Sequence, residues 1–172
     1  MTARFAPFAR LLHWTMAVLI LAMLFIGAGM LSTASARYPT LLAWHRPIGI
    51  TILVLALVRF GFRLTHRPPA LPDTVPDWQK AAAHASHWLL YALMIAMPLI
   101  GWAMQSAGGY PVLLTKAVVL PPILPHDIHL YGVLRTAHGL LAYAFFLLIL
   151  GHLGAALTHA LIRRDGVFQS MA

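Results

Sequence analysis

The sequence of 172 residues is strongly apolar and basic: 60% of its residues are hydrophobic, 9% are charged, and the formal net charge is +8. Because a soluble domain carries about 25% charged residues, this composition indicates a membrane protein. The sequence contains no cysteine, which excludes disulfide frameworks, thiolate zinc sites, cysteine nucleophiles and thiolate-bound iron–sulfur clusters.

The positive charges flank long apolar runs rather than forming a separate basic stripe. Lysines and arginines at such positions are topology signals in membrane proteins, whereas nucleic-acid binding needs a basic, solvated face. We therefore expect membrane lipid among the partners of this chain, and no nucleic acid.

Four apolar runs are long enough to cross a bilayer as helices, since one crossing needs about 20 apolar residues. The spans are expected at about residues 9–31, 41–62, 81–104 and 136–162. The first run is longer than the apolar core of a signal peptide and is interpreted as a retained helix. The predicted fold class is an all-α membrane protein, a single four-helix transmembrane domain over residues 1–172.

Two of the runs contain residues that disturb an apolar helix. The second run holds Arg46 near its start and Arg59 near its end, and both side chains are expected to extend toward the membrane surfaces. The third run holds Pro98, which is expected to bend its helix.

The linkers between the runs differ in composition. Residues 63–80 are rich in proline and aspartate, which predicts a stiff aqueous loop. Residues 106–135 form a longer loop, in which residues 112–120 are predicted to be a short helix on the membrane surface. Eight lysines and arginines lie on the side of the two termini and four on the other side, so the positive-inside rule places both termini in the cytoplasm.

Ten histidines are present, and their depth in the runs is informative. His138 and His152 share the fourth run, and 14 residues of helix return to within about 40° of the same direction after a rise of about 21 Å. His45 enters the second run from the outer side, and His13 enters the first run from the cytoplasmic side. This spacing predicts two histidine pairs: His13 with His152 at the inner end, and His45 with His138 at the outer end.

Two imidazoles that approach from opposite sides suit the iron of a haem, since each axial position takes one neutral nitrogen. A lone histidine near a helix end is more often an interfacial polar residue, but a matched set of four favours ligation. We therefore predict two b haems whose chemistry is electron transfer rather than oxygen activation. Three arginines near the predicted ligands are candidate partners of the haem propionates: Arg10, Arg46 and Arg135.

Other histidines leave alternatives open. His84 and His87 lie three residues apart on one helix face, so they cannot bind one iron from opposite sides, but either is an alternative inner ligand to His13. For His87 we favour a contact to a quinone or a propionate, and a packing role stays open. The loop residues His126, Asp127 and His129 have a spacing that suits a surface metal, although a solvated loop is the preferred interpretation.

The sequence resembles the bacterial cytochrome b561 family, small dihaem membrane proteins with four helices. The matching stretches are Arg-Leu-Leu-His-Trp at 10–14, Trp-His-Arg-Pro-Ile-Gly at 44–49, His-Ala-Ser-His-Trp-Leu-Leu-Tyr at 84–91, and the pattern from His138 to Gly151-His152. The resemblance implies that the first and second helices each give one axial histidine and the fourth gives two. It also implies a quinone-linked electron carrier of the bacterial cytoplasmic (inner) membrane.

The resemblance further implies an activity, the oxidation of superoxide at the periplasmic face with electrons passed to ubiquinone. Cations expected on the outer face are candidates for steering the superoxide anion toward the protein: Arg37, Arg46, Lys116 and Arg135. Propionate pairing and solubility explain these charges equally well, and no residue is assigned a catalytic role.

Two other functions compete with this interpretation. The chain could be the membrane anchor and electron conduit of a larger dehydrogenase or hydrogenase complex, or, more remotely, a histidine-lined metal transporter. A second copy of the chain and a redox subunit are the candidate protein partners.

Overall fold

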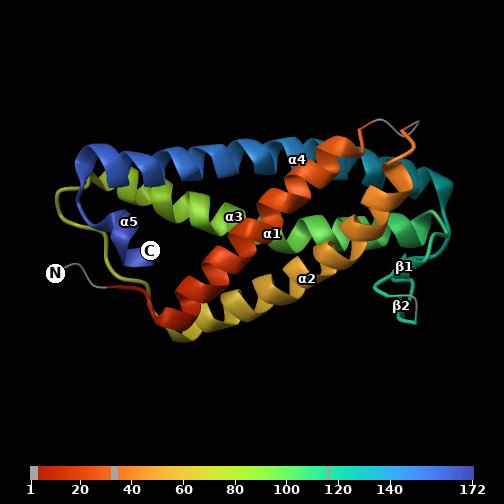
Figure 1. The fold of residues 1–172 in the computed structure, drawn as a ribbon, viewed down its shortest axis with the longest axis horizontal. Coiled ribbons are helices and arrows are strands. Elements are labelled where there is room, and N and C mark those ends of the chain that lie inside the picture. The colour runs from red at the N-terminus through yellow and green to blue at the C-terminus, as the bar shows by residue number, and fades with distance from the viewer. Residues whose placement is uncertain (1–3, 32–34, 116) are drawn as a thin grey trace.

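The computed structural model describes residues 4–31, 35–115 and 117–172. Its long helices are α1 (Pro7–Gly29), α2 (Tyr38–Thr65), α3 (Asp77–Ala107) and α4 (Ile128–Leu157), and α4 continues into a π-helical turn, η1 (Thr158–Arg163). All four long helices have the length and composition to cross a membrane. This confirms the predicted all-α, four-helix membrane fold. The helices form an elongated bundle with both termini at one end (Figure 1).

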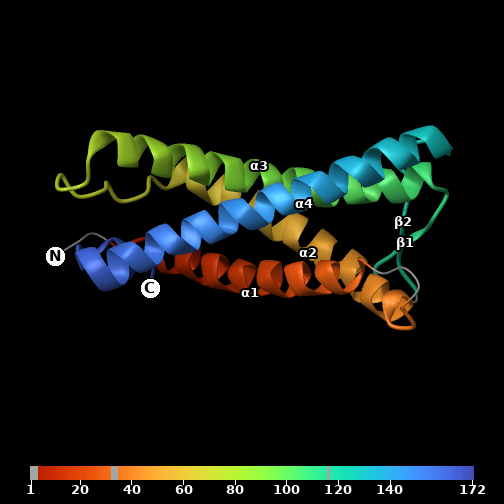
Figure 2. The same cartoon turned by 90° about the horizontal axis from the view of Figure 1, so that it is seen from above.

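Helices that follow one another in the chain pack together: α1 against α2, α2 against α3, and α3 against α4. In Figure 2, α4 runs obliquely from α3 at one end of the bundle toward α1 at the other. Within the described ranges, neither α1 with α4 nor α2 with α4 is a closely packed pair of backbones. Side chains therefore make the contacts between α4 and these two helices.

The helices extend beyond the apolar runs, so the predicted loops at 63–80 and 106–135 are too long. α2 continues to Thr65 and α3 begins at Asp77, while α4 begins at Ile128. The carboxylate of Asp127 accepts hydrogen bonds from the amides of His129 and Leu130 at 2.9 and 3.0 Å, and so caps the start of α4. Hydropathy marks where apolar residues end, whereas a helix ends where its backbone groups find other partners.

The predicted surface helix at 112–120 is wrong. Val112–Leu113 (β1) instead pairs with Val119–Leu120 (β2) in an antiparallel hairpin, with Val112 opposite Leu120. Thr115 Oγ1 accepts hydrogen bonds from the amides of residues 117 and 118 and holds the turn. β-branched valines favour strands, and the prolines at 111, 121 and 122 limit helix formation on both sides.

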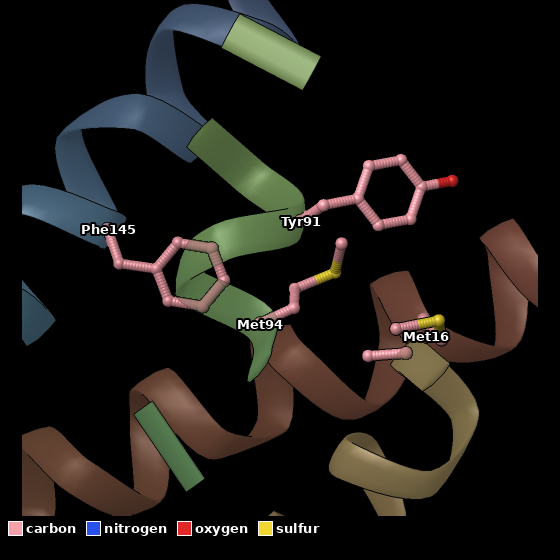
Figure 3. Close-up of a cluster of buried hydrophobic side chains, with 5 residues drawn as sticks. Met16, Tyr91, Met94 and Phe145 are labelled. Atoms are coloured by element: carbon pink, nitrogen blue, oxygen red, sulfur yellow. The ribbon is translucent and has the colours of Figure 1, made fainter. Parts of the chain in front are cut away.

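The buried core is one layer of side chains contributed by all four long helices. Its members are Met16, Ala56, Tyr91, Met94 and Phe145. Figure 3 shows the methionine, tyrosine and phenylalanine side chains of this core layer. Many large apolar side chains elsewhere point outward, such as Phe25, which is 79% exposed. That distribution suits a bundle surrounded by lipid, whose interior core can be small.

The C-terminal segment folds back onto the start of α1. After Arg164 and Gly166, which have φ angles of 52° and 83°, the chain forms a short helix, α5 (Val167–Met171). Trp14 Nε1 donates a hydrogen bond to the Met171 carbonyl at 3.1 Å, and the amide of Phe5 donates to the Ser170 carbonyl at 3.0 Å. These contacts attach the C-terminus beside the helix that carries His13.

Candidate cofactor site

The structure brings each predicted histidine pair together. The ring centroids of His13 on α1 and His152 on α4 lie 6.2 Å apart with 69° between the ring planes. The rings of His45 on α2 and His138 on α4 lie 6.2 Å apart at 65°. α4 therefore presents one histidine to α1 near the termini and another to α2 at the opposite end of the bundle.

This separation is the one that an iron between two imidazoles requires. A coordinating imidazole nitrogen lies about 2 Å from a first-row metal ion, and the ring centroid lies about 1 Å behind it, so two axial rings are about 6 Å apart. Both pairs meet this requirement, and both join helices whose backbones are not closely packed. The residues thus fit a haem at each end of the bundle.

The outer pair is enclosed by packing. The ring of His138 lies against Gly101 of α3, where an added Cβ would stand 3.3 Å from Cε1 of the histidine. The Nδ1 atoms of His45 and His138 are buried without a hydrogen-bond partner among the described residues. Buried polar atoms without partners are rare in proteins, and a bound group or a water molecule is one way in which they are satisfied.

The inner end has a third histidine. The ring of His87 on α3 lies 5.6 Å from the ring of His152, so His13 and His87 both face the same residue of α4. His84 is exposed and makes no ring contact with these three residues in the described part of the chain. The geometry therefore retains His87, and not His84, as the alternative inner ligand.

Two of the three arginines predicted to bind propionates keep a free, buried donor. Arg46 donates to the Pro111 carbonyl at 3.2 Å and to Gln105 Oε1 at 2.5 Å, while its Nε is buried without a partner in the described ranges. The Nε of Arg10 is also buried and unpartnered there. Such donors suit a carboxylate, the preferred partner of a guanidinium.

The remaining predicted cations lie at the surface or outside the described residues. Arg37 and Arg135 are exposed. Lys116 lies outside the described residues.

Arg59 is a residue of the site whose role the sequence did not predict. Its Nη1 donates to the Ala9 carbonyl at 3.0 Å, its Nε donates to Tyr91 Oη at 3.2 Å, and its Nη2 lies 3.3 Å from His13 Nδ1. The available signal was a charge within an apolar run, which marks function in membrane helices. Hydropathy gives the depth of such a charge but not its direction.

The loop cluster at 126–129 has a structural role. Hydrogen bonds from the amides of Leu130 and then His129 hold the pKa of the Asp127 carboxyl below its ordinary value. No group of three residues able to hold a metal ion occurs among the described residues. The capping of α4 explains Asp127 without a metal.

A second contact that the sequence did not predict joins His159 of η1 to Asp165, with 2.6 Å between Nδ1 and Oδ2. Both side chains are largely buried, at 16% and 12% exposure. Burial alone would raise the pKa of the Asp165 carboxyl, but hydrogen bonds from His159 and from the Val167 amide outweigh it, and the pKa is lowered. The contact depends on the left-handed turn at 164–166, which cannot be read from hydropathy.

Comparison with known proteins identifies the family. The profile of the prokaryotic cytochrome b561 family matches residues 4–172. The chain belongs to the prokaryotic cytochrome b561 family. As a member of this family it is a multi-pass membrane protein that binds b-type haem and takes part in electron transfer. The resemblance seen in its histidine motifs is thereby confirmed.

Individual relatives of this cytochrome b561 protein carry different names. Cytochrome b561 homolog 1 of Escherichia coli K12 is 28% identical over 171 residues, covering 98% of this chain and 96% of the relative. Cytochrome b561 homolog 2 of the same organism is 25% identical over 170 residues, covering 98% and 90%. Probable superoxide oxidase CybB of Yersinia pestis is 33% identical over 132 residues, covering 74% and 72%.

Proposed function

We propose that this protein is a dihaem cytochrome that oxidises superoxide at the outer face of the bacterial inner membrane and reduces ubiquinone. His13 and His152 hold the inner haem, and His45 and His138 hold the outer one. The observation that carries the proposal is the pair of equal ring separations, 6.2 Å each, built on one helix. Both termini then face the cytoplasm, in agreement with the distribution of lysines and arginines.

The bound haems supply one-electron oxidation and reduction. The chain would hold each haem between two imidazoles, an arrangement that suits electron transfer rather than oxygen binding. Arg10 at the inner end, and Arg46 and Arg135 at the outer end, bind the propionates. His87 contacts the quinone or serves as the alternative inner ligand, since its ring already lies beside that of His152.

The choice of superoxide rests on charge and on a relative. Superoxide is a small anion, and the exposed Arg37 and Arg135, together with the partly buried Arg46, give the outer end a positive charge that would raise its encounter rate. A relative at 33% identity is described as a probable superoxide oxidase. Two superoxide ions each give one electron and leave as oxygen, while one ubiquinone takes the two electrons and two protons from the cytoplasmic side.

The test is superoxide-driven reduction of ubiquinone by the purified haem-loaded protein in nanodiscs. We expect quinol formation that depends on a continuous superoxide source and slows as ionic strength rises, because salt screens the exposed cations. His138→Ala, which removes an outer ligand, is the inactive control. Quinol formation that occurs only when a dehydrogenase subunit is added would contradict the proposal and assign the protein as the electron conduit of a larger complex.

A further inference from the structure

We propose that Arg59 is a positioning residue that raises the reduction potential of the inner haem. The inference rests on the proposed function only in placing a haem between His13 and His152. Arg59 belongs to α2, contacts α1 and α3, and forms no ion pair among the described residues.

Three contacts fix the guanidinium of Arg59 beside the inner pair. Arg59 belongs to α2, yet it donates to Ala9 of α1 and to Tyr91 of α3, and Nη2 lies 3.3 Å from His13 Nδ1. Tyr91 belongs to the buried core layer and is 7% exposed. The position of the charge is therefore set by the packed interior and is not free to follow the solvent.

The charge of Arg59 has no carboxylate partner in the parts of the chain that the structure describes. The ion pairs found there join Lys80 to Asp77 and His159 to Asp165. The Arg59 side chain is partly buried, and the charge of a partly buried group is screened less than that of an exposed one. Adding an electron to the haem lowers the net positive charge there, so the nearby cation stabilises the reduced form and raises the potential.

The contact with the ring acts in the same direction. A metal-bound histidine ordinarily donates its second N–H to a carboxylate, a carbonyl or a water, which makes the ring a stronger ligand. A guanidinium can only donate hydrogen bonds, so His13 lacks this support from Arg59. A weaker donor ligand stabilises the oxidised iron less, and the potential rises further.

The outer pair lacks an equivalent contact. The charge of Arg46 also acts on the neighbouring His45, but its guanidinium is hydrogen-bonded to the Pro111 carbonyl and to Gln105 and does not contact the ring nitrogen. Among the described residues, Nδ1 of His45 and Nδ1 of His138 have no arginine within hydrogen-bonding distance. A raised potential of the inner haem favours electron flow from the outer haem to the inner haem, which is the direction that the proposed reaction needs.

The experiment is an optical redox titration of the haem-loaded Arg59→Gln variant. We expect reduction of the inner haem to become at least tenfold less favourable, which lowers its reduction potential by about 59 mV for one electron. The potential of the outer haem should shift less. The matched control is Arg63→Gln, one turn along α2, which removes the same charge. Arg63 packs over the rings of Trp88 and Tyr91 at 5.8 Å and does not hydrogen-bond the histidines, so a smaller shift is expected.

A second variant keeps the test decisive if Arg59→Gln fails to fold. Arg59→Lys retains the charge, so its inner haem should keep a potential close to that of the wild type, while its electron paramagnetic resonance signal changes with the ring contact. Unshifted potentials in Arg59→Gln would overturn the inference and leave the dihaem function intact. A tenfold or larger fall in the reduction equilibrium of the inner haem in Arg59→Lys would do the same. A wild-type protein without two haems would overturn the proposed function itself.

Discussion

At the scale of single residues, the site consists of polar side chains inside an apolar bundle, where each needs a hydrogen-bond partner. Arg46 and Arg59 donate hydrogen bonds to backbone carbonyls and to other side chains. The Nδ1 atoms of His45 and His138 are buried without a partner among the described residues. The pairing of His138 and His152 with different helices could be predicted, because a straight helix preserves its face over 14 residues. The direction of Arg59 could not, because the partner of a long side chain depends on the packing of three helices.

The capping of α4 by Asp127 gives a prediction at this scale. Because the pKa of this carboxyl is lowered in the folded protein, the folded state favours the charged form. The stabilisation is fully present above the ordinary pKa of 3.8 and is lost as the pH falls through the lowered value. Hydrogen exchange at His129 and Leu130, corrected for intrinsic rates, should therefore accelerate at acidic pH.

Asp127→Asn is the control for this prediction, because an asparagine caps a helix without titrating. In this variant the amides of His129 and Leu130 should show a protection from hydrogen exchange that does not change over the same acidic range. Asp127→Ala should lose protection at every pH. Equal pH dependence in the wild type and in Asp127→Asn would show that another group is responsible.

At the scale of secondary-structure elements, α4 organises the molecule. It carries a histidine toward α2 at one end and toward α1 at the other, and Phe145 lies seven residues from each. The existence of this helix could be predicted from its apolar run, but its start at Ile128 could not, because the first turns are stabilised by the cap at Asp127. The β1–β2 hairpin could not be predicted, because the pairing of two strands of two residues depends on the turn between them.

Phe145 gives a prediction for the core layer. It is 7% exposed and packs with Met94 and the other members of the layer. Phe145→Ala should lower the thermal unfolding midpoint in detergent, since removal of a buried phenylalanine costs about 3–5 kcal/mol in well-packed cores. The adjacent Phe146→Ala removes the same group from a side chain that is 42% exposed, and its midpoint should change less. A larger loss in the Phe146 variant would contradict the placement of the core.

At the scale of the whole molecule, the bundle separates two polar sites by one apolar layer. The histidine pairs lie toward opposite ends of the helices, about 21 Å apart along α4, with the core layer between them. The four-helix architecture could be predicted from hydropathy, and the two histidine pairs from histidine spacing. The C-terminal helix α5 on α1 could not, because it depends on a turn with two positive φ angles and on the contact between His159 and Asp165.

The most direct test of the account is the haem content of the purified protein and of two single variants. We predict two low-spin b haems per chain in the wild type. His138→Ala should lose mainly the outer haem and His152→Ala mainly the inner one, each variant keeping about one haem with its own reduction potential. One haem per wild-type chain, or loss of the same haem from both variants, would contradict the account.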